Sequence, residues 1–215
     1  VEIASSKGQD HLLAISGRAQ LPAAVTDVIV DRGEGKVIRK LANNAGAQFS
    51  DQGFSSIVAR AGTDDELVEI LGLRADFPAK LMGDLLRRFW MPALLSEELA
   101  ERDGPPKKIK ILGEELLAFR QTDGRVGIVE QHCPHRGANL YFGRNEECGI
   151  RCAFHGWKFD IDGNCVDLPT SPPESSYKDT IKLLAYPVRE WADMIWVYMG
   201  PREHMPELPQ LELGL

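Results

Sequence analysis

Two short stretches decide how the second half of this chain folds: CPHRGA at residues 133–138 and CAFHGWKFD at residues 152–160. Each contains one cysteine, one histidine and one glycine, and alternating polar and apolar residues surround both. Alternation with a period of two is typical of β-strands, and Asp162-Gly163-Asn164 is typical of a hairpin turn. The sequence therefore predicts a compact antiparallel β domain. Its strands are expected at residues 107–111, 115–120, 126–130, 148–154, 157–161, 183–191 and 194–199.

Cys133, His135, Cys152 and His155 offer two thiolates and two imidazoles to a metal centre. This ligand set suits either a structural zinc ion or a Rieske [2Fe–2S] cluster. In an extended loop, a Cys-x-His pair points both side chains the same way, yet far enough apart to reach two different metal atoms. The glycines after the histidines let the backbone approach a buried inorganic group and direct N–H groups towards it. The spacing therefore favours the cluster over zinc.

The two stretches also resemble the cluster loops of a known family. CPHRGA and CAFHGWKFD are similar to those of the Rieske domain of ring-hydroxylating non-haem iron oxygenases. The wider run over residues 132–170, which contains both stretches, resembles the phthalate 4,5-dioxygenase-like branch. The resemblance extends from about Met82 to Leu208. It implies that Cys133 and Cys152 hold one iron of a [2Fe–2S] cluster, and that the other iron is held by His135 and His155. The residues expected around the cluster are Arg136, Gly137, Phe154, Gly156 and Trp157.

The remaining cysteines and the aromatic residues near the loops are expected to have structural roles only. Cys148 and Cys165 are expected to be small buried residues in strands. Phe154 and Trp157 are expected to form an apolar wall beside the cluster, whereas Tyr141 and Phe142 are expected in the core. Rieske proteins of respiratory complexes carry a disulfide whose cysteines correspond to Ala138 and Phe154, so its absence favours the oxygenase or ferredoxin type.

The first half of the chain carries a repeat of 28 residues. Leu21, Phe49 and Phe77 follow one another at that spacing, and each precedes a residue that commonly starts a helix. These starting residues are Pro22, Ser50 and Pro78. The same spacing relates Ile29, Ile57 and Leu85, then Val30, Val58 and Leu86, and finally Arg32, Arg60 and Arg88.

The repeat predicts three helical hairpins stacked as a short solenoid, because one hairpin cannot bury its apolar face alone. Helical runs are expected at His11–Ser16, Lys36–Ala42 and Glu66–Leu71, and Gly33 and Gly62 are expected at helix ends. Residues 10–88 resemble a HEAT-like bacterial domain of unknown function. The predicted fold class is α+β, with an N-terminal α-helical HEAT-like repeat over 1–88 and an antiparallel all-β Rieske domain with a C-terminal tail over 89–215.

Composition limits the kinds of partner. The net charge is −7, from 25 basic and 32 acidic residues, which argues against a nucleic-acid binder with a broad basic surface. No apolar run approaches the length of a membrane span, and the start, VEIASSKGQD, lacks the apolar region of a signal peptide. Only four cysteines occur, so metal binding in a reducing compartment is favoured over a disulfide scaffold. We expect a cytoplasmic protein without nucleic-acid or membrane partners.

The resemblance also implies a role. Oxygenases of this family need a second site, in which two histidines and a carboxylate hold a mononuclear iron. His204 is the only histidine after His155, so we expect this chain to lack that site, to contain no catalytic residue and not to hydroxylate alone. It is expected to be the electron-entry module of an aromatic-ring-hydroxylating oxygenase, an oxidoreductase whose catalytic domain lies outside this chain.

The expected electron donor is an NADH-dependent reductase or a ferredoxin, and the expected acceptor is an oxygenase catalytic domain. Because the family forms oligomers, a homo-oligomer is also expected. Two alternatives stay open. One is a stand-alone Rieske ferredoxin. The other is a helical-repeat module that binds a protein partner and uses the cluster as a redox sensor.

Overall fold

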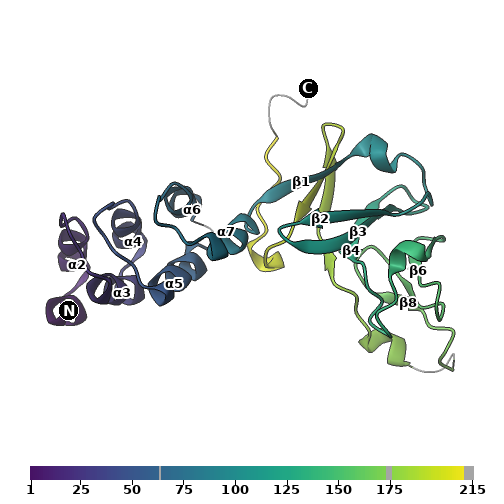
Figure 1. Ribbon diagram of the computed structural model, residues 1–215, viewed down its shortest axis with the longest axis horizontal. Coiled ribbons are helices and arrows are strands. Elements are labelled where there is room, and N and C mark those ends of the chain that lie inside the picture. Colours follow the sequence, from purple (N-terminus) through teal and green to yellow (C-terminus); the bar gives the residue numbers. More distant parts are fainter. Residues whose placement is uncertain (63, 173–175, 211–215) are drawn as a thin grey trace. The chain divides into compact units, whose positions relative to one another are not determined.

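The computed structural model describes residues 1–62, 64–172 and 176–210. The chain divides into two compact units, Val1–Arg88 and Phe89–Leu215. In the described residues the first unit is helical, and the second is built from antiparallel sheets (Figure 1). The predicted α+β class is therefore confirmed.

The helices of the first unit form two series. Within the odd-numbered series each helix contacts the next, and the even-numbered series behaves in the same way. The odd series is α1 (Glu2–Ser6), α3 (Ala23–Arg32), α5 (Asp51–Ala61) and α7 (Ala79–Leu86), and the even series is α2 (Gln9–Ser16), α4 (Gly35–Ala42) and α6 (Asp65–Gly72). The repeat-related Ile29, Ile57 and Leu85 are all buried in the core of this unit. Stacked helical hairpins are thus observed, while the HEAT-like type of repeat stays a prediction.

The predicted helix starts and ends lie close to the observed ones. Pro22, Ser50 and Pro78 each occupy the capping position immediately before a helix, so the two prolines lie one residue earlier than a first helical position. The hydroxyl of Ser50 accepts a hydrogen bond from the backbone N–H of Gly53 at 2.9 Å, which satisfies one otherwise unpaired donor of α5. The residues that follow the ends of α3 and α5 are Gly33 and Gly62.

The repeated arginines connect successive repeats. Arg60 donates hydrogen bonds to the carbonyls of Val30 and Gly33 at the end of α3. Arg88 reaches the equivalent place at the end of α5, with a bond of 3.0 Å to the carbonyl of Val58. The last carbonyls of a helix lack partners within the helix and carry partial negative charge. A guanidinium from the following repeat therefore caps each of these helices.

The described residues of the second unit form three antiparallel sheets. The first has the order β1 (Trp90–Leu95), β11 (Met194–Tyr198), β10 (Val188–Trp191). The second has the order β2 (Lys107–Ile111), β3 (Glu114–Arg120), β4 (Val126–Glu130), β9 (Ala185–Tyr186). The third, which is small, has the order β5 (Arg144–Asn145), β6 (Ile150–Arg151), β7 (Lys158–Phe159), β8 (Cys165–Asp167).

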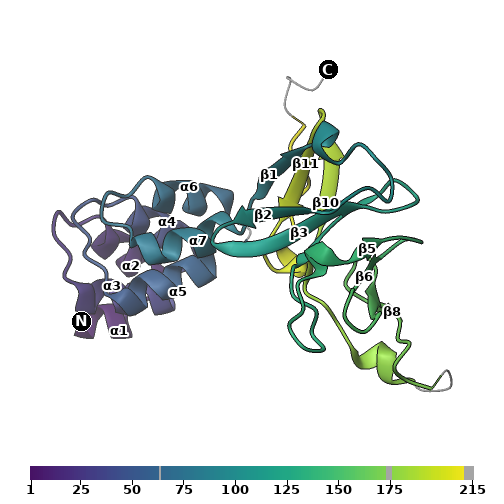
Figure 2. The same ribbon diagram turned by 45° about the vertical axis from the view of Figure 1, so that its right-hand side comes forward.

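The small sheet carries the two cysteine-histidine loops. One loop leads from β4 into β5, and the other joins β6 to β7; Figure 2 shows this sheet beside the longer strands of the same unit. The turn predicted at Asp162-Gly163-Asn164 joins β7 to β8. Gly163 has a φ of +78°, and a Cβ there would lie 2.0 Å from the carbonyl oxygen of Leu183. Only glycine fits this turn, which is confirmed.

The core beneath the loops is apolar. Ile150, Phe159 and Cys165 lie on one face of the small sheet and belong to the same buried cluster as Cys133 and Cys152. None of the helices in the described part of the chain has the length and hydropathy that a bilayer span requires.

Candidate metal centre

The first loop is closed by two backbone hydrogen bonds. The N–H of Gly137 donates to the carbonyl of Cys133 at 2.9 Å, and the N–H of Cys133 donates to the carbonyl of Ala138 at 2.9 Å. Gly137 has a φ of +69°, a left-handed conformation that glycine adopts without strain. These contacts form a tight turn that keeps the cysteine and histidine of CPHRGA together.

The second loop has the same backbone frame. The N–H of Gly156 donates to the carbonyl of Cys152 at 3.0 Å, and the N–H of Cys152 donates to the carbonyl of Trp157 at 2.8 Å. Gly156 has a φ of +77°. The cysteine and glycine are therefore equivalent in both loops, whereas the histidine is the third residue of the first frame and the fourth of the second.

The structure places the four residues that the sequence predicts as ligands in two pairs, one of cysteines and one of histidines. Cys133 and Cys152 belong to the same buried cluster, and the thiol of Cys152 is near enough to contribute to the raised pKa of Cys133. The ring centroids of His135 and His155 are 4.5 Å apart, and both histidines are half-buried. The two thiols thus form an inner pair and the two imidazoles a pair nearer the surface.

Burial controls the charge of these groups in the absence of a metal. Burial and the neighbouring Cys152 raise the pKa of Cys133 to about 11, because a thiolate loses its hydration there. Burial also lowers the pKa of His135, and the neighbouring His155 and Arg136 act in the same direction. At neutral pH the thiol of Cys133 is therefore protonated, and the imidazole of His135 is neutral. Neutral imidazole is the form that binds metals, and a bound metal would displace the thiol protons.

One buried atom tests whether an iron-sulfur cluster fits here. Nδ1 of His135 is buried and has no hydrogen-bond partner among the described residues, which is costly unless the atom binds something. In the described part of the chain, no three His, Cys, Asp or Glu side chains gather around a single point as one metal ion requires. Two thiols and two imidazoles are the donor set that a Rieske cluster with two irons uses.

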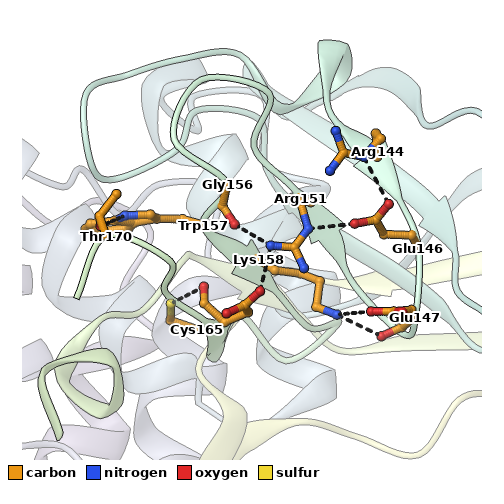
Figure 3. Close-up of polar contacts among 10 residues, drawn as sticks. Arg144, Glu146, Glu147, Arg151, Gly156, Trp157, Lys158, Cys165 and Thr170 are labelled. Atoms are coloured by element: carbon orange, nitrogen blue, oxygen red, sulfur yellow. Dashed lines mark hydrogen bonds and ion pairs between the residues drawn. The ribbon is translucent and has the colours of Figure 1, made fainter. Parts of the chain in front are cut away.

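The residues expected around the cluster have different roles. Trp157 of the second loop stacks on His135 of the first, with ring centroids 4.3 Å apart and ring planes 9° apart. Its indole N–H donates to the hydroxyl of Thr170 at 2.9 Å (Figure 3). Phe154 contacts His155, with centroids 4.0 Å apart, but is 61% exposed. The apolar wall is therefore made by the tryptophan, and the phenylalanine lies at the surface.

Three further expectations from the sequence are wrong. Cys148 lies in the turn between β5 and β6, with a φ of +58°, and not in a strand. Tyr141 is 40% and Phe142 is 70% exposed, so neither belongs to the core. The ammonium group of Lys108 lies over both rings, 4.5 Å and 5.4 Å from their centroids. This cation–π contact stabilises two aromatic side chains that are not buried. Cys165, in contrast, is buried in β8 as expected.

Sequence reasoning missed the polar partners of the second loop. Arg151 precedes Cys152 and donates to the carbonyl of Gly156, and Thr170 holds Trp157 (Figure 3). One signal was available for the arginine. A cation within a strand, next to a predicted ligand and between Glu146 and Asp167, indicates a neutralised and partly buried charge.

Comparison with known proteins identifies both halves. Residues 89–187 match the family model described as the Rieske [2Fe-2S] domain. Residues 1–127 match the model described as an uncharacterised protein conserved in bacteria, DUF2336. The chain belongs to DUF2336 and carries a Rieske domain. The two matches overlap over residues 89–127, and there the division of the structure after Arg88 assigns the strands to the Rieske domain.

Relatives of the Rieske domain are oxygenase subunits. The chain is 51% identical over 132 residues to the 3-chlorobenzoate-3,4-dioxygenase oxygenase subunit of Comamonas testosteroni, which covers 61% of this chain and 30% of that protein. It is 44% identical over 145 residues to the phthalate 4,5-dioxygenase oxygenase subunit of Pseudomonas putida, covering 67% of this chain and 32% of that protein. The chain thus spans about a third of the length of these relatives.

A solved structure agrees with these relatives. Dicamba monooxygenase with non-heme iron and dicamba matches with a TM-score of 0.53 and 30% identity, over 59% of this chain and 38% of that chain. The Rieske domain of this protein is therefore of the kind found in Rieske oxygenases, and its cofactor is a [2Fe–2S] cluster.

Proposed function

We propose that this chain passes single electrons into an aromatic-ring-hydroxylating oxygenase of the phthalate dioxygenase type, as its electron-entry module. In this proposal Cys133 and Cys152 hold one iron of the cluster, and His135 and His155 hold the other. The observation that carries the assignment is the pairing itself. One shared backbone frame places two buried thiols side by side and two imidazoles side by side. The unpartnered Nδ1 of His135 supplies the ligand atom on that ring.

When bound, a Rieske cluster accepts one electron and gives it up again without other chemistry. The residues of this chain determine where the electron enters and leaves. The thiols are buried, whereas His135 and His155 are half-buried and lie beside the exposed Phe154 and Arg136. The histidine side is therefore the shortest route between the cluster and a docked partner.

The partners follow from this role and are part of the proposal. An NADH-dependent reductase or a ferredoxin would deliver the electron, and an oxygenase catalytic domain would receive it. Within these 215 residues, His204 is the only histidine after His155, so the mononuclear iron of such an oxygenase would need ligands from elsewhere. We also propose a cytoplasmic location, because the chain's four cysteines are free thiols in the structure, as expected in a reducing compartment.

A spectroelectrochemical titration of the purified chain tests this function. The visible spectrum should change reversibly as one electron is taken up per chain, with the slope of a one-electron couple of about 59 mV per tenfold change in the oxidised-to-reduced ratio. The matched variant His155→Ala should abolish that transition, and His132→Ala should keep it. A visible spectrum that does not respond to potential, or that responds equally in both variants, would refute the proposal.

A further inference from the structure

Arg151 is tied to the second cluster loop by strong contacts. It ends β6, directly before Cys152, and its side chain is only 13% exposed. Nε donates to a carboxylate oxygen of Glu146 at 2.6 Å, and Nη1 donates to Asp167 at 2.7 Å and to the carbonyl of Gly156 at 2.7 Å (Figure 3). Charge-assisted bonds of this length are among the strongest that side chains form.

Arg151 differs from the neighbouring cations of the sheet because it bonds to a cluster loop. Arg144 on β5 and Lys158 on β7 are its cross-strand partners, so the three cations form a row on one face of the sheet. The charges in this row are balanced by contacts with Glu146, Glu147 and Asp167. Arg144 is 66% exposed. Among the described residues, only Arg151 of this row bonds to a cluster loop.

Gly156 links that contact to both imidazoles. It directly follows His155, and a Cβ on it would lie 3.2 Å from Cγ of Pro169, so Pro169 packs closely against the residue whose carbonyl Arg151 binds. The next residue is Trp157, which stacks on His135. A shift of the Gly156 carbonyl would therefore move His155 through the backbone and His135 through the stacked rings.

We propose that Arg151 is a positioning residue for the cluster, which sets the orientation of both histidines by fixing the carbonyl of Gly156. The inference rests on the proposed function and adds a role to a residue outside the four ligands. A contribution of the ion pairs to stability does not explain why an arginine occupies position 151, because buried ion pairs often add little stability compared with apolar residues. A planar guanidinium can bond a carboxylate and a carbonyl at fixed angles, whereas a lysine ammonium cannot reproduce that geometry.

The test compares Arg151→Lys with Arg144→Lys in the full chain, since both substitutions keep the charge. Two properties are measured: the g-values of the reduced cluster by electron paramagnetic resonance, and the rate at which a chelator removes its iron. In Arg151→Lys the g-values should shift and the cluster should be lost about 10-fold faster, which is the scale on which outer partners act on metal sites. Arg144→Lys should match the wild type in both.

Each other outcome is also informative. Wild-type g-values and wild-type loss rates in Arg151→Lys would overturn the inference. If Arg151→Lys takes up no cluster, the melting temperatures of the cluster-free variant and wild type are compared, to separate a positioning role from a role in folding. An unchanged melting temperature supports a positioning role, whereas a marked fall shows a role in folding alone and contradicts the inference. If the wild type itself gives no Rieske signal, the proposed function fails instead.

Discussion

The indole of Trp157 lies flat on the imidazole of His135, with centroids 4.3 Å apart and planes 9° apart. The two residues come from different loops, so this stack joins the loops independently of any metal. The hydroxyl of Thr170 holds the indole N–H at 2.9 Å, which prevents the ring from turning. The tryptophan is 6% exposed, and it therefore also closes the apolar side of the site.

Replacement of this tryptophan should destabilise the Rieske domain. Trp157→Ala should lower its free energy of unfolding by about 3–5 kcal/mol, because a buried aromatic ring is removed and a cavity is left. Thr170→Val should cost about 1 kcal/mol, the value of one hydrogen bond. Urea unfolding checks both. Phe154→Ala is the control, since its exposed ring should contribute less than about 0.5 kcal/mol; equal losses in Trp157→Ala and Phe154→Ala would contradict the stacking role.

Replacement of single cysteines should distinguish those that bind the cluster from those that do not. Cys152→Ser should prevent cluster binding, because an alkoxide is a poor substitute for a thiolate ligand of iron-sulfur clusters. Cys165→Ser is the matched control, since this cysteine is equally buried but bonds to the backbone of Asp167. Iron and acid-labile sulfide are measured per chain. Retention of the cluster in Cys152→Ser, or its loss in both variants, would show that the ligands are wrongly assigned.

The ion pair between Arg120 and Glu190 predicts a pH dependence of stability. Two hydrogen bonds of 2.7 Å and 2.9 Å join them across two sheets, and those bonds lower the pKa of Glu190. A carboxylate with a lowered pKa stabilises the folded state above its unfolded pKa of about 4.3, and this contribution is lost as the pH falls through the folded pKa.

The variant Glu190→Gln should therefore be less stable than the wild type by about 1 kcal/mol at neutral pH. The difference should shrink as the pH is lowered below the unfolded pKa, because the wild type then loses its own charge. Urea unfolding over a series of pH values measures it. Glu97→Gln, at an exposed carboxylate, should match the wild type throughout. A deficit of Glu190→Gln that grows in acid would contradict this account.

The repeated arginines predict the stability of the helical unit. Arg60→Met removes the donors to the carbonyls of Val30 and Gly33, and should cost about 1–3 kcal/mol, the range for hydrogen bonds to charged groups. Arg18→Met is the control, because this arginine is exposed and no hydrogen bond from its side chain appears among the described residues. Thermal unfolding followed by helical circular dichroism checks both. Equal melting temperatures for the two variants would show that the cap contributes nothing.

Much of this architecture was predictable because its determinants are local. The spacing of 28 residues relates Ile29, Ile57 and Leu85, and all three lie in one buried core, since stacked hairpins of equal length can bury equivalent positions. Each loop keeps its cysteine and histidine close together, because both residues lie in one tight turn. The HEAT-like type of repeat and the ligand roles themselves stay predictions.

The parts that sequence reasoning missed depend on contacts between distant segments. Arg151 meets Asp167 and Gly156 only after the small sheet forms, and Thr170 meets Trp157 in the same way. Phe142 was expected in the core, but Lys108 of β2 stabilises it at the surface. Hydrophobicity indicates which side chains favour burial, but it does not reveal a cation that lies over an exposed ring.

The measurement that tests the central claim most directly is electron paramagnetic resonance of the dithionite-reduced wild-type chain, with iron, sulfide and zinc determined on the same sample. The account predicts two irons and two sulfides per chain and the rhombic signal of a Rieske cluster with mixed cysteine and histidine ligands. In parallel, His135→Ala should lose that signal. A colourless protein that contains one zinc ion per chain and gives no signal would contradict the claim.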